Sequence, residues 1–242
     1  MNPGPAPEAT LAEIVAALRD TGGAVLSSQP DIQRSSEPGA DALMPFCAIC
    51  RLAHRSVERS LRAFFSEFVN DPEIRVRFRK SRGFCREHIP LLASCGDALG
   101  VAILYADLTD ETRRRWRSGG AKGSLFSRWF QPSSEMPCPS CAAEAEAEAR
   151  YAGALANGLA GDPALWETLR ESAGLCSRHV ERVAAVSRPA DAARIIEMEA
   201  ARMDALYAEL EEFVRKNDYR FRAEPWGPER DAWRRALSRL RR

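Results

Sequence analysis

Apolar side chains recur at helical spacing along most of the chain. The clearest run follows Cys50 and comprises Val57, Leu61, Phe64, Phe65 and Phe68. Residues three and four positions apart share one face of an α-helix, whereas a half-buried strand alternates apolar and polar residues. No sustained alternation occurs, and the chain is rich in Ala, Glu, Arg and Leu. The pattern predicts an all-α fold with little or no sheet.

The first helical run is followed by signals for a turn and a second helix. Asn70-Asp71-Pro72 supplies a stop, an N-cap and a first-turn proline. The second helix is expected from about Pro72 to Arg79, and Ser81-Arg82-Gly83 interrupts it. The two helices are predicted to form an antiparallel hairpin.

Further helices are expected after each hairpin. Leu99, Ile103 and Leu104 mark the first of them, and a heptad-like seam marks the second, with apolar residues at Ile196, Met203, Leu206, Leu210 and Phe213. Together the pattern predicts a helical bundle built from two duplicated helical-hairpin units.

The duplication itself is carried by cysteine and histidine. Both copies read Cys-x2-Cys-x34-Cys-x2-His, and the offset between them is constant, since 138 − 47 and 179 − 88 both equal 91. The same offset pairs Asp71-Pro72 with Asp162-Pro163 and Gly83 with Gly174. This is an internal repeat, because no gap is needed to align the copies.

Eight residues in the repeated positions are candidate metal ligands. They are Cys47, Cys50, Cys85 and His88 in the first copy, and Cys138, Cys141, Cys176 and His179 in the second. The alternative, buried thiols and hydrogen-bonded core histidines, does not explain the spacing. If each hairpin returns to its start, one metal closes its open end, so we predict one Cys3His site per repeat. Cys95 and His54 have no counterpart and are expected to be ordinary helix residues.

Three thiolates and an imidazole match a closed tetrahedral zinc site. The expected cofactors are therefore two Zn²⁺ ions in structural sites. Two [4Fe-4S] clusters are the alternative, although all-cysteine ligation is commoner for them. Zinc would indicate a scaffold that supports a protein-interaction or accessory role, whereas clusters would indicate an electron-transfer or redox-accessory protein.

The repeats leave three other segments. The predicted organisation is an N-terminal helix and flexible segment (1–44), repeat 1 (45–118), a linker (119–135), repeat 2 (136–216) and an aromatic and basic tail (217–242). The linker carries aromatic side chains within residues 125–130. They could dock into a groove of the bundle, or contact a partner or a membrane surface, and the sequence leaves these alternatives open.

Composition narrows the function classes. The 35 basic and 34 acidic residues nearly cancel, which argues against a uniformly basic nucleic-acid-binding surface. No apolar stretch approaches the length of a membrane span, and no signal peptide is recognised, so we expect a cytoplasmic protein. In a reducing compartment, clustered Cys and His usually bind metal.

Two further functions are weaker on the sequence. No nucleophile elbow, phosphate-binding glycine loop or HExxH motif is present, so catalysis is uncertain and a non-enzymatic role is favoured. Nucleic-acid binding is suggested by basic residues near the first site, namely Arg75, Arg77, Arg79, Lys80, Arg82 and Arg86, and by the arginine-rich tail. The second repeat lacks most of these charges, so a protein partner is the favoured expectation.

The duplicated boxes, the Asp-Pro turns and the closing segment DYRFRAEPWG together resemble an uncharacterised bacterial family, a domain of unknown function. The resemblance covers roughly residues 45 to 242. It implies that the eight Cys and His residues bind metal, and it implies no activity. The first box departs slightly, with Ala48 where the second has Pro139.

Overall fold

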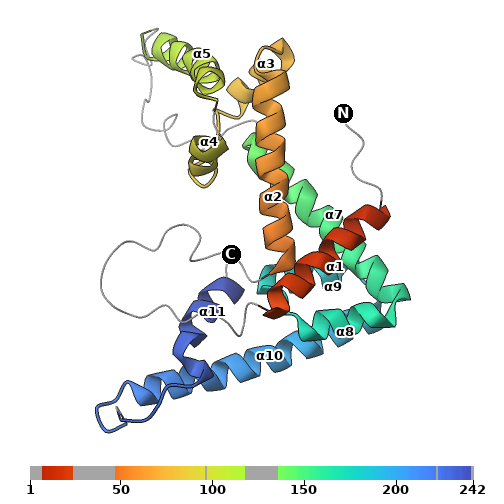
Figure 1. Cartoon of the computed structure of the whole chain (residues 1–242). Coiled ribbons are helices and arrows are strands. Elements are labelled where there is room, and N and C mark those ends of the chain that lie inside the picture. Colours follow the sequence, from red (N-terminus) through yellow and green to blue (C-terminus); the bar gives the residue numbers. More distant parts are fainter. Residues whose placement is uncertain (1–6, 24–46, 96, 118–135, 222, 241–242) are drawn as a thin grey trace, which may run out of the picture. The chain divides into compact units, whose positions relative to one another are not determined.

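A computed structural model describes residues 7–23, 47–95, 97–117, 136–221 and 223–240. Every regular element in these ranges is a helix, and no strand occurs among them. The all-α prediction is therefore confirmed. Figure 1 shows the order of the helices along the chain. The predicted linker, including its aromatic stretch 125–130, lies outside the described residues.

The chain divides into two compact units. Unit 1 comprises Met1–Ala53 and Glu148–Arg242, and unit 2 comprises His54–Ala147. The division passes through helix α2 (Ala48–Ala63) and helix α7 (Pro139–Gly161). The compact units are thus a different partition from the two sequence repeats, and the domain boundaries given above stay a prediction.

Unit 1 is formed by helices from both ends of the chain. Besides the first turns of α2 and most of α7, it contains α1 (Pro7–Gly23), α8 (Pro163–Glu171), α9 (Ser177–Val186), α10 (Pro189–Lys216), the 3-10 helix η3 (Pro228–Asp231) and α11 (Ala232–Arg239). Fully buried side chains of its core include Leu18, Tyr151, Leu155, Leu169 and Ile195. Helix α10 packs against α9, α11 and η3.

Unit 2 holds the rest of α2, which continues as the π-helix η2 (Phe64–Phe68), followed by α3 (Pro72–Lys80), α4 (Ile89–Cys95), α5 (Ala98–Arg117) and the start of α7. Its core is rich in aromatic side chains. Phe78 packs against Phe84 and Tyr105 with ring centroids 5.4 and 5.6 Å apart. Such edge-on and tilted ring pairs add specific contacts to the burial of apolar area.

The predicted turns lie where the sequence places them. Asp71 caps α3 by accepting hydrogen bonds from the backbone N–H groups of Glu73 and Ile74, and Asp162 caps α8 by accepting one from Ala164. A proline follows each cap in the first turn, where its missing N–H has no cost. Both repeats therefore contain a long helix, an Asp-Pro turn and a short helix.

Candidate metal centres

The eight predicted ligands form two groups. Site A contains Cys47, Cys50, Cys176 and His179, and site B contains Cys85, His88, Cys138 and Cys141. Within each group, the ligand atoms all lie within 4.8 Å of one another. All four residues of site A belong to unit 1, and all four of site B belong to unit 2.

The predicted grouping of these ligands was wrong. Each site joins the Cys-x2-Cys box of one repeat to the Cys-x2-His box of the other, instead of closing within one repeat. Helix length explains the difference. Helix α2 and its π-helical continuation have 16 and 5 residues, whereas the return helix α3 has 9. At about 1.5 Å per residue the outgoing leg spans about 30 Å and the return leg about 13 Å, so the hairpin does not close on its start.

Repeat 2 has the same imbalance, with 23 residues in α7 and 9 in α8. Each Cys-x2-Cys box opens a long helix, since the Cys47 carbonyl accepts from the Arg51 N–H at 3.2 Å and the Cys138 carbonyl from the Ala142 N–H at 3.0 Å. Two cysteines three positions apart on a first helical turn point to the same side.

The Cys-x2-His boxes follow a tight loop in both repeats, and each loop contains a left-handed glycine. Gly83 and Gly174 have φ values of +87° and +84°, a left-handed conformation that glycine adopts without strain. The carbonyl oxygens of Cys85 and Cys176 then accept the histidine N–H at 3.0 and 2.9 Å. The loop thereby turns each cysteine and histidine toward one point.

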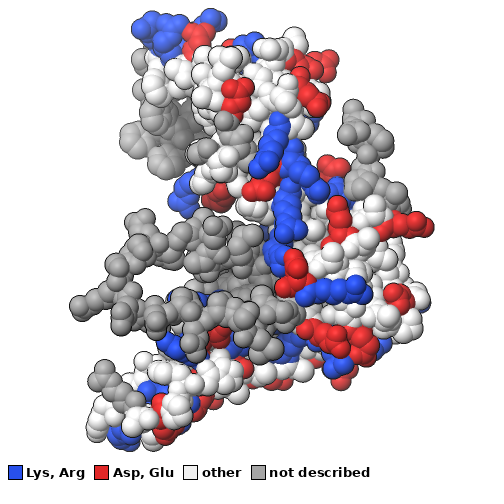
Figure 2. Space-filling view, viewed as in Figure 1, with Lys and Arg blue, Asp and Glu red and all other residues white. Residues whose placement is uncertain are grey.

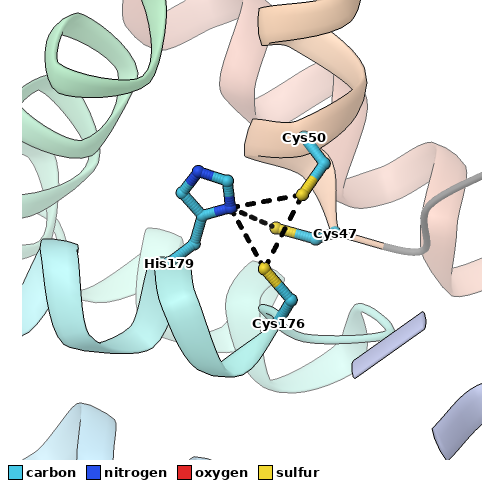
Figure 3. Close-up of side chains that lie close together, drawn as sticks. All are labelled: Cys47, Cys50, Cys176 and His179. Atoms are coloured by element: carbon cyan, nitrogen blue, oxygen red, sulfur yellow. Dashed lines mark hydrogen bonds between the residues drawn. The ribbon is translucent and has the colours of Figure 1, made fainter. Parts of the chain in front are cut away.

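In site A, Nδ1 of His179 faces the three sulfurs (Figure 3). It lies 3.1 Å from Sγ of Cys176, 3.3 Å from Sγ of Cys50 and 3.5 Å from Sγ of Cys47. The sulfurs of Cys50 and Cys176 are 3.6 Å apart. His179 is fully buried.

Site B repeats this arrangement. Nδ1 of His88 lies 3.1 Å from Sγ of Cys85, 3.4 Å from Sγ of Cys141 and 3.9 Å from Sγ of Cys138. The sulfurs of Cys85 and Cys141 are 3.5 Å apart. Cys85 and Cys141 are partly exposed, whereas in site A only Cys50 is.

A carboxylate lies beside the second ring nitrogen of each histidine. Nε2 of His179 is 3.3 Å from Oε1 of Glu148, which is within ion-pair distance. Among the described residues, this nitrogen has no partner that meets the geometry of a hydrogen bond. Nε2 of His88 is 3.5 Å from Oε2 of Glu144. Carboxylates in this position fix the ring and the tautomer of metal-bound histidines.

The two outer carboxylates differ in their own support. Glu148 is buried, and its Oε2 accepts from Arg178 at 2.8 Å and from Arg182 at 2.5 Å. Burial raises the pKa of Glu148, but His179 and these two arginines outweigh it, so that pKa lies below its ordinary value. Glu144 is 36% exposed.

The thiols cannot all lose their protons unaided. Hydrogen bonds with Cys176 and Cys47 raise the pKa of Cys50, and Cys47 and Cys50 in turn lower the pKa of Cys176. In site B, burial and then the contact with Cys85 raise the pKa of Cys141 to about 12. Adjacent thiolates repel one another, and a bound cation removes that penalty while releasing protons.

A polar clamp, formed by Glu199, Arg202 and Arg239, holds the loop of site A. Oε1 of the buried Glu199 accepts from the Leu175 N–H at 3.1 Å and from Arg202 at 2.5 Å, and Oε2 accepts from Arg239 at 3.2 Å. Arg202 also donates to the carbonyl of Leu169 at 2.7 Å, and Arg239 to those of Leu175 and Ala173. No motif in the sequence marks these three residues as a set.

Several residues singled out by sequence fall outside both sites. His54 lies 3.7 Å from Glu58, one helical turn away, and is exposed, as expected of an ordinary helix residue. The side chain of Cys95 is outside the described part of the structure. Of the six basic residues near the first Cys-x2-His box, Arg75 and Arg79 pair with Asp107 at 2.6 and 3.2 Å.

A different set of basic residues gathers on one helix face. Figure 2 shows Lys and Arg side chains running along α2. The arginines of this helix, Arg51, Arg55, Arg59 and Arg62, recur at spacings of four, four and three, so they share one face. Arg55, Arg59 and Arg62 are exposed. We call this set the α2 arginine row; its spacing is visible in the sequence.

The chain is similar to proteins already grouped as a family. The model of a family described as of unknown function (DUF6062) matches residues 40–242, which include both sites. An "Uncharacterized 23.9 kDa protein in xynA 3'region" of Caldicellulosiruptor sp. (strain Rt8B.4) is 29% identical over 178 residues, or 72% of this chain and 83% of that protein. No solved structure matches. Among the described helices, none combines the length and apolar character needed to span a bilayer.

Proposed function

The chain belongs to this family of unknown function, and we propose that it is a metalloprotein with two mononuclear structural zinc centres, sites A and B. The observation that carries the proposal is the spacing of the ligand atoms. In tetrahedral zinc with Zn–S of about 2.3 Å and Zn–N of about 2.0 Å, ligand atoms lie about 3.5 to 3.8 Å apart. The distances from histidine Nδ1 to the three sulfurs are 3.1 to 3.5 Å in site A and 3.1 to 3.9 Å in site B, and one sulfur–sulfur distance in each site is 3.6 and 3.5 Å.

The same spacing disfavours the iron-sulfur alternative. Each ligand of a [4Fe-4S] cluster binds a different iron, so the four ligand atoms must be spread by the width of the cluster. Ligand atoms that all lie within 4.8 Å of one another suit a single ion better. Iron-sulfur clusters with a role in electron transfer are therefore the less favoured identity of the two centres.

A structural role follows from the donor set. Four protein ligands complete a tetrahedral zinc, which then has no open position for water or substrate. In each site the ion would join the start of a long helix to a loop from the other repeat, at positions 126 to 132 residues apart in site A. Closing so long a loop restricts the unfolded chain strongly. We propose that the centres stabilise a scaffold that contacts a protein partner.

Metal content and absorption test the proposal. Protein purified without oxygen should carry two zinc equivalents per chain and be colourless, whereas iron-sulfur clusters absorb in the visible range. Because air can destroy a cluster and allow zinc to replace it, the anaerobic sample is decisive. Iron with matching inorganic sulfide would overturn the zinc assignment.

Paired substitutions test which ligands share an ion. Cys50→Ala with Cys176→Ala changes site A twice and should lose one metal equivalent. Cys50→Ala with Cys85→Ala changes both sites and should lose two. Grouping within the repeats predicts the reverse outcomes, so the two double variants separate the alternatives. Cys95→Ser is the control thiol, since its position in the other repeat holds Val186, and it should retain both equivalents.

Nucleic-acid binding is a second candidate, favoured by the α2 arginine row. Such a row can contact successive phosphates, and binding of this kind weakens steeply with salt. Changing Arg55, Arg59 and Arg62 to Gln should then abolish salt-sensitive binding of a mixed-sequence DNA or RNA duplex. If the parent protein binds no duplex at low salt, the row is a solvated helix face.

A further inference from the structure

Helix α10 has an apolar stripe that includes exposed side chains. Its residues lie alternately four and three positions apart and are Ile196, Ala200, Met203, Tyr207, Leu210 and Val214. Ile196 is 52% exposed, Tyr207 63% and Val214 71%. This spacing is that of a coiled-coil seam, which ordinarily packs against another helix. Of the heptad-like seam expected from the sequence, Leu206 is buried, whereas Ile196 is exposed and Met203, Leu210 and Phe213 are partly exposed.

Helix α11 has a second apolar stripe, formed by Trp233, Leu237 and Leu240. Their side chains are 42%, 59% and 55% exposed. The opposite face of α11 is held to the rest of unit 1 by two arginines. Arg235 pairs with Glu209 of α10, and Arg239 belongs to the polar clamp. The exposed stripe is therefore presented outward from a helix that is fixed in place.

The charges beside the two stripes are opposite. Glu197, Asp204 and Glu211 are exposed and lie seven positions apart. Each comes directly after a residue of the α10 stripe. In an antiparallel pair of α10 helices, these acidic rows would face each other and repel. Beside the α11 stripe lies the exposed Arg234, over the ring of Trp233. The acidic residues beside the α10 stripe thus favour packing against a helix with a basic residue beside its own apolar stripe, and α11 is such a helix.

We propose that the protein self-associates through these faces, with the α11 stripe of one copy packed on the α10 stripe of a second copy. This goes beyond the metal centres and uses none of their ligands. Because each copy offers both faces, a two-fold arrangement makes the contact twice and closes the assembly. Helix α11 has 8 residues, about 12 Å, and covers roughly half of the stripe. The interface is small, so dissociation in the micromolar range is expected.

Sedimentation of the full, metal-loaded chain across the micromolar range tests the proposal. The parent should show a monomer–dimer equilibrium, and Tyr207→Glu or Leu237→Glu should each weaken it at least tenfold. Leu99→Glu is the matched control, because Leu99 is 68% exposed on α5 of unit 2, and it should leave the equilibrium unchanged. All three positions are exposed, so none of the changes should unfold the chain.

Mixing separates this contact from other pairings. A mixture of the Tyr207→Glu and Leu237→Glu chains keeps one intact α10–α11 contact and should form a heterodimer, whereas the double variant should not self-associate. Asp204→Arg should weaken the dimer, and Arg234→Glu in the same chain should restore part of it. A parent that stays monomeric across the micromolar range overturns the proposal. So does a dimer that Leu237→Glu leaves intact.

Discussion

The loop before Cys85 and the loop before Cys176 share a serine hydrogen bond and a left-handed glycine, but they lie in different surroundings. Ser81 and Ser172 donate to the carbonyl oxygens three residues earlier at 2.9 and 2.8 Å. Both loops then pass through a left-handed glycine. A methyl group on Gly83 would meet Leu108, Phe78 and Tyr105, whereas one on Gly174 would meet Arg202 and Glu199.

The difference can be traced to one pair of repeat positions. Because 108 + 91 is 199, Leu108 of repeat 1 corresponds to Glu199 of repeat 2. One copy therefore supports its metal-binding loop with apolar packing, and the other supports it with a buried carboxylate and two arginines. Removing one partner from a buried charge network leaves the other charges unpaired. Truncating an apolar side chain instead costs stability roughly in proportion to the atoms removed.

Breaking the polar clamp should have the largest effect. Glu199→Ala leaves Arg202 and Arg239 without their carboxylate and the Leu175 N–H without its acceptor. We expect a loss of about 3 to 5 kcal/mol, as for other broken buried ion pairs. Zinc in site A should be released to a chelator faster, and zinc in site B should not. Equal release from both sites would show that the clamp does not act on the loop.

The matching change in unit 2 should cost less. Leu108→Ala removes apolar atoms beside Gly83 without leaving a charge unpaired. Because Leu108 is only partly buried, we expect about 2 kcal/mol, at the low end for leucine truncation. Chemical denaturation with unit-resolved hydrogen exchange measures it, with Leu99→Ala as the exposed control. A cost above that of Glu199→Ala would reverse the comparison.

The outer carboxylates should also differ. Glu148→Gln removes the charge beside His179 and leaves Arg178 and Arg182 without their partner, so zinc affinity of site A should fall by about 10- to 100-fold. Glu144→Gln should change site B less, because that carboxylate is 36% exposed and farther from its histidine. Competition with a chromophoric chelator gives both affinities. Equal losses would mean that burial of the carboxylate is unimportant.

The ligands could be predicted from the sequence, but their grouping could not. A constant offset between two copies identifies eight residues without any knowledge of their positions. Grouping them depends on how far the return helix reaches back toward the start of the outgoing helices, which have 16 and 5 residues against 9 in α3. The repeat pattern is the same for either grouping and does not decide between them. The all-α class followed from periodicity alone, because that class depends only on the faces of single helices.

The supporting residues were harder to predict for two reasons. Arg239 is 64 residues from Leu175, whose carbonyl it binds, and no motif links such positions. The outer carboxylates lie in the stretch AAEAEAEA, where Glu144, Glu146 and Glu148 look alike. The spacing of four between Glu144 and Glu148 places them on one helix face, and only that signal was available.

The short helices of the two repeats provide the smallest test of the comparison. In repeat 2, α8 is anchored by the buried Trp166, whose Nε1 donates to the Leu159 carbonyl at 2.9 Å. The corresponding position in repeat 1, since 166 − 91 is 75, is Arg75, which holds α3 to α5 through two hydrogen bonds to Asp107 at 2.7 and 2.6 Å. These hydrogen bonds lower the pKa of Asp107 below its ordinary 3.8.

Asp107→Asn should therefore destabilise unit 2 by about 1 kcal/mol or less at neutral pH, because the pair is partly exposed and screened. A carboxyl group with a lowered folded-state pKa contributes stability above its unfolded pKa and loses it as pH falls through the folded value. The difference in stability between parent and variant should thus be constant above about pH 5 and shrink as the pH falls below it. Asp110→Asn is the control, because among the described residues Asp110 pairs within α5, with Arg113 and Arg114. Thermal unfolding across this pH range measures the gap, and a gap that persists in acid would show that the interaction is not between charges.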